Sequence, residues 1–139
     1  MATINIYLNF AGNTEEAFNF YKSVLGGDFL MIQRFKDTPG SEKMAEDEQE
    51  KIMHISLPVG NNVLMGTDAL ESQGFTLTIG NNYNISLSAD SEEEAEKFFN
   101  GLSAGGKVVM PMEKTFWNAY FGMCIDKFGI SWMVNFDYK

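Results

Sequence analysis

The stretch IYLNFAGNTEEAFNFYKSVLGG, residues 6–27, predicts a β-strand that leads directly into a helix. Apolar side chains occupy every second position at its start, which is typical of a half-buried strand. Thr14 then provides a good N-cap, and two glutamates follow in the first helical turn, where the helix dipole favours anions. Gly26 and Gly27 end the helix, because glycine readily adopts the backbone conformation of a C-terminal stop.

The stretch NISLSADSEEEAEKFFNGLSAGG, residues 84–106, repeats these features in the same order. Its strand alternates in the same way, Ser91 stands at the helix start, and two glycines end the helix. Both helices carry an alanine followed by an aromatic pair, which is Ala17 with Phe20 and Tyr21, and Ala95 with Phe98 and Phe99. This agreement indicates an internal repeat with a period of about 78 residues.

The repeat continues beyond the two helices. Short β-rich runs follow both glycine pairs, and LPVGNNVLM, residues 57–65, then parallels DKFGISWMV, residues 126–134. In each of these segments a strand turns at a glycine and returns as another strand. The stretch GFTLTIGNNYN between the halves is a Gly- and Asn-rich linker with one weak strand.

The predicted fold is therefore α+β, with β-α-β-β-β written twice in a single domain of residues 1–139. Module one covers about residues 1–68 and module two about residues 82–139. One module cannot cover both faces of its own strands. We expect the two modules to form one cupped mixed sheet with helices on the convex side, which leaves a concave pocket.

Composition and charge exclude several classes of function. The net charge of −9 opposes binding to a nucleic-acid backbone, and a small neutral or cationic ligand fits it better. No apolar run is long enough to span a membrane, and the N-terminal stretch reads as a strand rather than a signal peptide. A single cysteine, Cys124, suits a reducing cytoplasm and predicts a packing role more readily than a nucleophile.

Four stretches that cover nearly the whole chain resemble the vicinal oxygen chelate superfamily of glyoxalases, bleomycin-resistance proteins and extradiol dioxygenases. They are YLNFAGNTEEAFNFYKSVLGG, IMHISLPVGNNVLMGTD, ISLSADSEEEAEKFFNGLSAGGKVVMPMEKTFW and YFGMCIDKFGISWMVNF. The set is most similar to the PhnB-like branch. This resemblance implies paired βαβββ modules in a glyoxalase-like fold, and a homodimer.

The resemblance also implies four metal-ligand positions, on the first and last strands of each module, usually filled by His, Glu or Gln. Strand alternation turns Tyr7, Asn9, Asn84 and Ser86 toward the pocket. The glutamate position of the family falls on Met133, whose repeat partner we take to be Leu64. Amides, hydroxyls and apolar groups are poor ligands for Zn, Fe, Mn or Ni, so we expect no metal cofactor, with a divalent transition metal as the alternative.

His54, the only histidine, lies in the predicted strand KIMHISL. Alternation places Met53, Ile55 and Leu57 on the apolar face, and Ile52, His54 and Ser56 on the face toward the pocket. Three roles are open for His54. It is a hydrogen-bonded neighbour with no function, a ligand-binding or general acid/base residue, or the sole anchor of a metal.

Two further stretches bear on the pocket. The loop EKTFWNAYFG carries an aromatic cluster that includes Trp117 and Tyr120, and such a cluster is costly to leave in water. We expect Trp117 and Tyr120 to contact the ligand in the pocket, with packing in a dimer as the alternative for Trp117. Residues 36–51 form a polar insertion with a short acidic helix capped by Ser41, which is either a solvated loop or a lid.

Three functions are compatible with these features. The preferred one is a small-molecule-binding protein of the glyoxalase/bleomycin-resistance type, with an organic ligand in an aromatic and amide-lined cup. The second is a metal-dependent lyase, isomerase or dioxygenase that uses His54, and the third is a dimeric scaffold. An older label of the PhnB-like branch invokes ubiquinone methylation, but Gly26 and Gly27 end a helix rather than open one as a nucleotide loop does.

Overall fold

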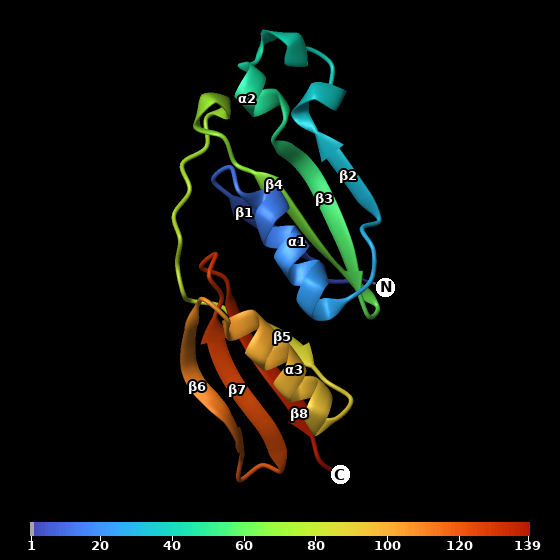
Figure 1. Cartoon of the computed structure of the whole chain (residues 1–139), viewed down its shortest axis with the longest axis vertical. Helices are drawn as coiled ribbons and strands as arrows, with labels where there is room; N and C mark the ends of the chain where they lie inside the picture. Colours follow the sequence, from blue (N-terminus) through green and yellow to red (C-terminus); the bar gives the residue numbers. More distant parts are fainter. Residues whose placement is uncertain (1) are drawn as a thin grey trace. The chain divides into compact units, whose positions relative to one another are not determined.

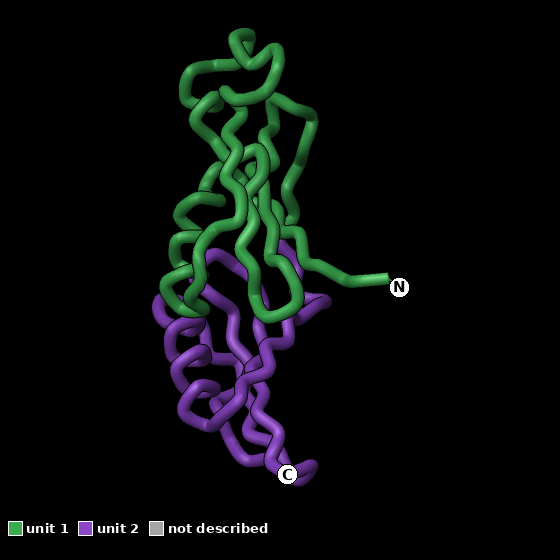
Figure 2. Tube along the Cα trace, turned by 90° about the vertical axis from the view of Figure 1, so that its right-hand side faces the viewer, with its two compact units in different colours: residues 1–78 green, residues 79–139 purple. Residues whose placement is uncertain are grey.

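The computed structural model describes residues 2–139 and divides the chain into two compact units, residues 1–78 and 79–139 (Figure 2). Each unit contains one strand, one long helix and three further strands, in that order along the chain (Figure 1). The predicted α+β fold of two β-α-β-β-β modules is confirmed. Among the described residues, no helix combines the length and the apolarity needed to cross a bilayer.

The first unit is built around one four-stranded mixed sheet. Its strands and main helix are β1 (Ile6–Phe10), α1 (Thr14–Leu25), β2 (Met31–Arg34), β3 (Ile52–Val59) and β4 (Asn62–Asp68). The strand order is β1-β4-β3-β2, with β1 parallel to β4 and the other pairs antiparallel. Helix α1 packs against β3 and β4 and covers one face of this sheet (Figure 1).

The second unit repeats this topology. Its elements are β5 (Ile85–Ser88), α3 (Glu92–Ser103), β6 (Lys107–Lys114), β7 (Ala119–Ile125) and β8 (Ser131–Asp137). The strand order is β5-β8-β7-β6, with β5 parallel to β8 and α3 packed on β6, β7 and β8. The weak strand expected in the linker does not form, since residues 74–84 contain no strand.

The core of each unit lies between its helix and its sheet. In the first unit Phe18 and Tyr21 of α1 and Leu57 of β3 are fully buried. A glycine is required below Phe18, because a Cβ atom at Gly66 would lie 2.5 Å from the Phe18 ring. In the second unit the buried core comprises Ala95, Phe99, Leu102, Trp132 and Val134.

The two helices begin in different ways. Ser91 caps α3 as predicted, because its hydroxyl accepts a hydrogen bond from the backbone nitrogen of Glu94 at 3.0 Å. The predicted N-cap role of Thr14 is wrong, since Thr14 is the first residue of α1 and its hydroxyl donates to Asp68 at 2.6 Å. Asp68, at the end of β4, therefore supplies the acceptor that Thr14 was expected to provide.

Strand β3 departs from simple alternation at its start. Gln33 pairs with His54 but Arg34 pairs with Ile52, so one extra residue is inserted into β3 at this point. The insertion turns Ile52 into the core, where its side chain is 1% exposed. The prediction that Ile52 shares a face with His54 is therefore wrong.

The acidic insertion is anchored at both ends. It contains three short elements, η1 (Phe35–Asp37), η2 (Ser41–Lys43) and α2 (Glu46–Gln49), so the predicted helix capped by Ser41 is shorter and starts later. The backbone nitrogen of Phe35 donates to the carbonyl of Lys51 at 3.1 Å, which closes the base of the segment. Lys36 and Glu50 form an ion pair at 3.0 Å across the same base.

Candidate functional site

The face of the first sheet that α1 leaves uncovered carries most of the predicted ligand-binding residues of the first unit. One row of paired positions crosses all four strands, and the row next to it contains two further pairs. The first row is Tyr7, Met65, Ser56 and Met31, and the second contains Asn9 with Thr67 and Gln33 with His54. We call this surface the His54 face.

Tyr7 and His54 meet on this face although 47 residues separate them. The Tyr7 hydroxyl lies 3.3 Å from Nδ1 of His54, and the ring centroids are 5.7 Å apart at an angle of 46°. They come from β1 and β3, which flank β4, so both side chains lean over the central strand. Tyr7 remains 46% exposed and His54 is half-buried, so both present atoms to a ligand.

The His54 face does not fit the metal centre that the superfamily implies. A divalent transition metal needs several imidazole, carboxylate or thiolate ligands that converge on one point. His54 is the only histidine, and its neighbours on the face carry hydroxyls, amides and thioethers. Across residues 2–139, no three His, Cys, Asp or Glu side chains lie close enough together to hold a metal ion.

The second unit has a corresponding face, in which Ser86 pairs with Met133 and Met133 with Met123. Ser86 on β5 pairs with Met133, and the equivalent residue of the first unit, Tyr7 on β1, pairs with Met65. The repeat partner of Met133 is therefore Met65. The pairing of Met133 with Leu64 predicted from sequence is wrong by one residue, and Leu64 is buried on the other side of its sheet.

The predicted polar residues of module two lie at the start of this face. Ser86 is exposed on β5, whereas Asn84 is exposed just before the strand begins. By the same repeat, Phe121 occupies the position that His54 has in the first unit. The two units therefore present chemically different surfaces.

Trp117 lies in the connection between β6 and β7 and is 53% exposed. Its ring packs edge-on against Phe121 at 5.9 Å and against Phe116 at 5.0 Å, and Phe116 is itself 97% exposed. Because Phe121 points to the helix-free side of its sheet, Trp117 extends the apolar surface there. The geometry is compatible with either role that the sequence left open for Trp117.

Tyr120 lies on the opposite side of β7, next to α3. Its hydroxyl donates to Oε1 of Glu96 at 2.7 Å, and this hydrogen bond raises the pKa of Tyr120 to about 12. Trp117 and Tyr120 were expected to line one pocket, but Tyr120 faces the helix and Trp117 packs on the other side. We therefore leave Tyr120 out of the candidate site.

Cys124 is buried on the same side of β7 as Tyr120. Burial raises the pKa of its thiol to about 11, so the thiolate that a nucleophile needs is disfavoured at neutral pH. The side chain packs against the core as a small apolar group.

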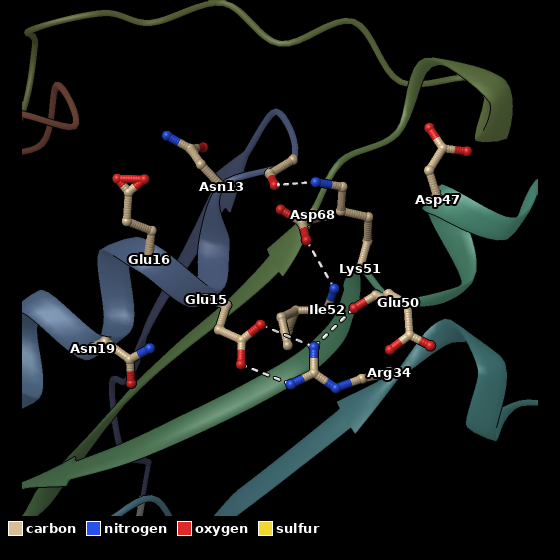
Figure 3. A pocket seen from close by; sticks show the side chains of 11 residues that line it. Asn13, Glu15, Glu16, Asn19, Arg34, Asp47, Glu50, Lys51, Ile52 and Asp68 are labelled. Atoms are coloured by element: carbon tan, nitrogen blue, oxygen red, sulfur yellow. Dashed lines mark hydrogen bonds and ion pairs between the residues drawn. The ribbon is translucent and has the colours of Figure 1, made fainter.

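A pocket that the sequence did not indicate lies at the N-terminal end of α1, between the helix and the acidic insertion (Figure 3). Its volume is about 670 Å³. The lining is mostly charged and consists of Gly12, Asn13, Glu15, Glu16, Asn19, Arg34, Asp47, Glu50, Lys51, Ile52 and Asp68. In the sequence its two cations stand as isolated residues, so no motif signalled this pocket.

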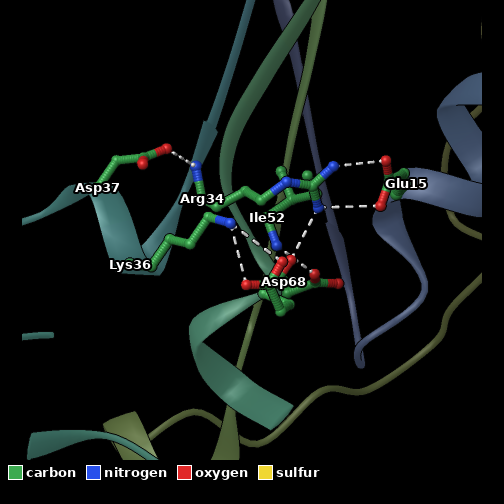
Figure 4. Close-up of polar contacts among 7 residues, drawn as sticks. Glu15, Arg34, Lys36, Asp37, Ile52 and Asp68 are labelled. Atoms are coloured by element: carbon green, nitrogen blue, oxygen red, sulfur yellow. Dashed lines mark hydrogen bonds and ion pairs between the residues drawn. The ribbon is translucent and has the colours of Figure 1, made fainter. Parts of the chain in front are cut away.

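The cations of this pocket already bind groups of the chain itself. Arg34 donates two hydrogen bonds to Glu15, at 3.0 and 2.7 Å, and one to the carbonyl of Glu50 at 2.8 Å (Figure 4). The hydrogen bonds from Arg34 hold the pKa of the Glu15 carboxyl below its ordinary value. Lys51 donates to the carbonyl of Gly12 at 2.8 Å. These contacts tie the insertion to α1, and we assign the pocket no ligand.

The model of the 3-demethylubiquinone-9 3-methyltransferase family matches residues 2–135. The chain belongs to this family. Within it, a PhnB protein of Bacillus cereus, described as a putative 3-demethylubiquinone-9 3-methyltransferase, is 25% identical with a TM-score of 0.77, covering 97% of this chain and 99% of that one. Protein PA1353 of Pseudomonas aeruginosa is 41% identical with a TM-score of 0.87, and the match covers both chains completely.

A more distant structure shares the fold and carries a glyoxalase name. A glyoxalase/bleomycin resistance protein/dioxygenase family enzyme from Burkholderia phytofirmans PsJN is 17% identical with a TM-score of 0.64, covering 95% of this chain and 97% of that one. At this identity the likeness concerns the fold alone. The resemblance to the PhnB-like branch is confirmed, and so is the glyoxalase-like fold that it implies.

Proposed function

We propose that this protein binds a small organic molecule on the His54 face and that binding, rather than chemistry on a metal, is its function. The contact between Tyr7 and His54 carries this proposal, because it brings two partly exposed aromatic side chains with polar atoms to one spot of an uncovered sheet. Tyrosine and histidine combine an apolar body with a polar tip, which suits the recognition of small molecules.

The rest of the face supports the same conclusion. Met31 and Met65 supply flexible thioether side chains that adapt to an apolar ligand. Asn9 and Gln33 supply amide groups that make no hydrogen bond to another side chain within residues 2–139. A surface of this kind offers both contact area and directional groups.

The second unit is included in the proposal through its own helix-free face. Ser86, Met133 and Trp117 present a hydroxyl, a thioether and an aromatic ring there, and Asn84 lies just outside the strand. The indole of Trp117 suits stacking on a flat ligand. We propose that these residues contact small molecules in the same manner.

Two enzymatic functions receive less support. The family description names a methyltransferase, but Gly26 and Gly27 lie at the C-terminal end of α1, where Gly26 caps the helix, so they do not form a nucleotide-binding loop. A metal-dependent lyase, isomerase or dioxygenase needs carboxylate or imidazole partners for His54, and the residues paired around it supply none.

The proposal is tested by screening small organic molecules against the labelled protein by NMR. The chain has a single histidine, so the imidazole signals of His54 are assigned without ambiguity. We expect binders that shift these signals in the wild type and lose affinity in Tyr7→Ala and His54→Ala. Tyr83→Ala, which removes a partly exposed tyrosine of the second unit, is the control. Ligands that bind Tyr7→Ala and His54→Ala as tightly as the wild type would place the site elsewhere.

We also propose that the protein is a homodimer. Strand β6 lies at the edge of its sheet, and Val108, Val109 and Met110 are each 47% exposed on it. Exposed apolar side chains on an edge strand favour association with another chain. Light scattering after size exclusion should give twice the chain mass of 15.6 kDa, and Val109→Lys should reduce it to one chain while Ile4→Lys does not. A wild-type mass of one chain would reject the proposal.

A further inference from the structure

The hydrogen bond between Tyr7 and His54 restricts where the imidazole carries its proton. Nδ1 of His54 is the ring nitrogen that faces the Tyr7 hydroxyl, at 3.3 Å. A neutral imidazole has one nitrogen that donates and one that accepts, and the partner of one nitrogen decides the state of the other. A phenol donates a hydrogen bond more readily than it accepts one. With the Tyr7 O–H donating to Nδ1, the proton of neutral His54 must be on Nε2.

Protonation of the ring does not change what Nε2 offers. In the imidazolium form both nitrogens carry protons, so Nδ1 donates to the Tyr7 oxygen and Nε2 still carries its own. The neutral and charged forms therefore both present an N–H group at Nε2. A ligand that contacts Nε2 needs a hydrogen-bond acceptor.

No acidic residue occupies the described strand positions around His54 in the first sheet. The positions that surround His54 come from its own strand β3 and from β1, β2 and β4. They are Ser56 on β3, Tyr7 and Asn9 on β1, Met31 and Gln33 on β2, and Met65 and Thr67 on β4. Apart from Tyr7 and His54 itself, none of these groups titrates.

The acidic residues of the first unit lie elsewhere. They are in α1, in residues 37–50 and in the connections, and the carboxylate of Asp68 points toward Thr14 and the backbone of Ile52. The net charge of −9, which favours neutral or cationic ligands when only the sequence is considered, therefore does not describe this face. Exposed charges more than about 8 Å away are largely screened at physiological salt.

We infer that the ligand of the His54 face carries a carboxylate, which accepts a hydrogen bond from Nε2 of His54, and an apolar body that lies over Tyr7 and Met65. This inference rests on the function proposed above and names its ligand class. A singly charged carboxylate fits better than a phosphate, because His54 is the one side chain at these positions that can carry a positive charge, and phosphate sites usually combine several cationic or backbone donors.

The first test determines the tautomer of His54. Long-range ¹H–¹⁵N spectra separate the two neutral tautomers, and the single histidine gives one set of signals. We expect the proton on Nε2 in the wild type and a mixture of tautomers in Tyr7→Phe, which removes only the hydroxyl. Tyr83→Phe is the matched control and should leave the tautomer unchanged. A proton on Nδ1 of neutral wild-type His54 would overturn the inference.

The second test compares three probes of nearly the same shape: benzoate, benzamide and benzamidine. Each is titrated into the wild type at about pH 5.5 and about pH 8, on either side of the usual range for imidazole. We expect benzoate to bind about tenfold more tightly than benzamide at the lower pH. A tenfold difference in affinity is about what one charge-assisted hydrogen bond contributes. The preference should shrink at the higher pH.

The outcomes separate this inference from the proposed function. If benzamide or benzamidine shifts the His54 signals with an affinity equal to that of benzoate, the face binds small molecules but does not select carboxylates. In that case the proposed function stands and the inference falls. If none of the three probes shifts these signals, both are overturned. His54→Gln, which keeps a donor but no charge, should bind benzoate without dependence on pH between the two conditions.

Discussion

The carboxylate of Asp68 holds the start of the first helix by accepting hydrogen bonds from both the backbone nitrogen and the hydroxyl of Thr14, at 3.0 and 2.6 Å. Its second oxygen accepts from the backbone nitrogen of Ile52 at 2.8 Å (Figure 4). Asp68 is 3% exposed, so all three donors are satisfied away from water. One side chain at the end of β4 therefore joins α1 to the start of β3.

Removing this carboxylate should destabilise the first unit. We expect Asp68→Ala to lower the free energy of unfolding by about 3 kcal/mol, because three buried donors lose a charged acceptor. Urea unfolding followed by NMR amide signals of α1 measures the change. Asp28→Ala is the control, since the Asp28 side chain is 94% exposed and pairs only with Lys22. A loss for Asp68→Ala no larger than that of Asp28→Ala would contradict this assignment.

Gly66 allows α1 to approach its sheet closely. A Cβ atom there would lie 2.5 Å from Cε1 and 2.9 Å from Cζ of Phe18, so Gly66→Ala should cost about 1–3 kcal/mol of stability. Combining Gly66→Ala with Phe18→Leu should cost less than the sum of the two single changes, as a double-mutant cycle in urea would show.

Gly80→Ala is the control for the Gly66 cycle. Its Cβ atom would be 3.8 Å from the nearest side-chain atom, so no steric cost is expected. Strict additivity of Gly66→Ala and Phe18→Leu would show that the two residues do not compete for the same space.

Arg34 connects α1 to the acidic insertion, and its contribution to the free energy of unfolding should depend on pH. The pKa of Glu15 is lower in the folded protein than its ordinary value of 4.5, so the stabilisation is fully present above about pH 4.5. It is lost as the pH falls through the lower folded value and Glu15 takes up a proton. Because the Glu15 side chain is about half exposed, we expect Arg34→Ala to cost about 0.5–1 kcal/mol at neutral pH.

Urea unfolding of wild type and Arg34→Ala at a series of pH values measures this dependence. Lys43→Ala removes an exposed cation for which residues 2–139 show no ion pair, and its effect should stay near zero throughout. A difference between wild type and Arg34→Ala that stays constant down to about pH 3 would exclude Glu15 as the partner.

Tyr120 should ionise later than an ordinary tyrosine. Its hydrogen bond to Glu96 raises the pKa of Tyr120 to about 12, so the neutral phenol stabilises the fold up to the ordinary value of 10.0 and this contribution fades toward pH 12. The difference between the ultraviolet titrations of wild type and Glu96→Ala isolates the transition of Tyr120. Glu96→Ala should move that transition toward pH 10, while Glu93→Ala on the same helix should not.

The repeated β-α-β-β-β order is readable from the sequence because its signals are local. Alternating apolar residues, a capping Ser91 and the glycine stops act within a few residues of one another, so the elements follow from short-range physical preferences. The predicted strands that contain Tyr7, His54 and Met133 all form. The family resemblance rests on the same local patterns taken in order.

Errors arose where a distant residue or one inserted residue decided the outcome. Thr14 does not cap its own helix, because Asp68, 54 residues away, accepts its hydrogen bonds. Ile52 is buried because one extra residue in β3 reverses the alternation that the sequence pattern implies. Neither effect leaves a signal in the adjacent sequence.

The sequence by itself determined which helices and strands form and in what order. It excluded only a few classes of ligand. The tertiary structure decided which side chains meet: Tyr7 reaches His54 across β4, and Tyr120 turns to Glu96 rather than to the side of Trp117. It also showed that a chain of net charge −9 has a sheet face with no acidic residue around its only histidine. The reason is physical: periodicity determines local conformation, whereas strand pairing determines which distant groups share a surface.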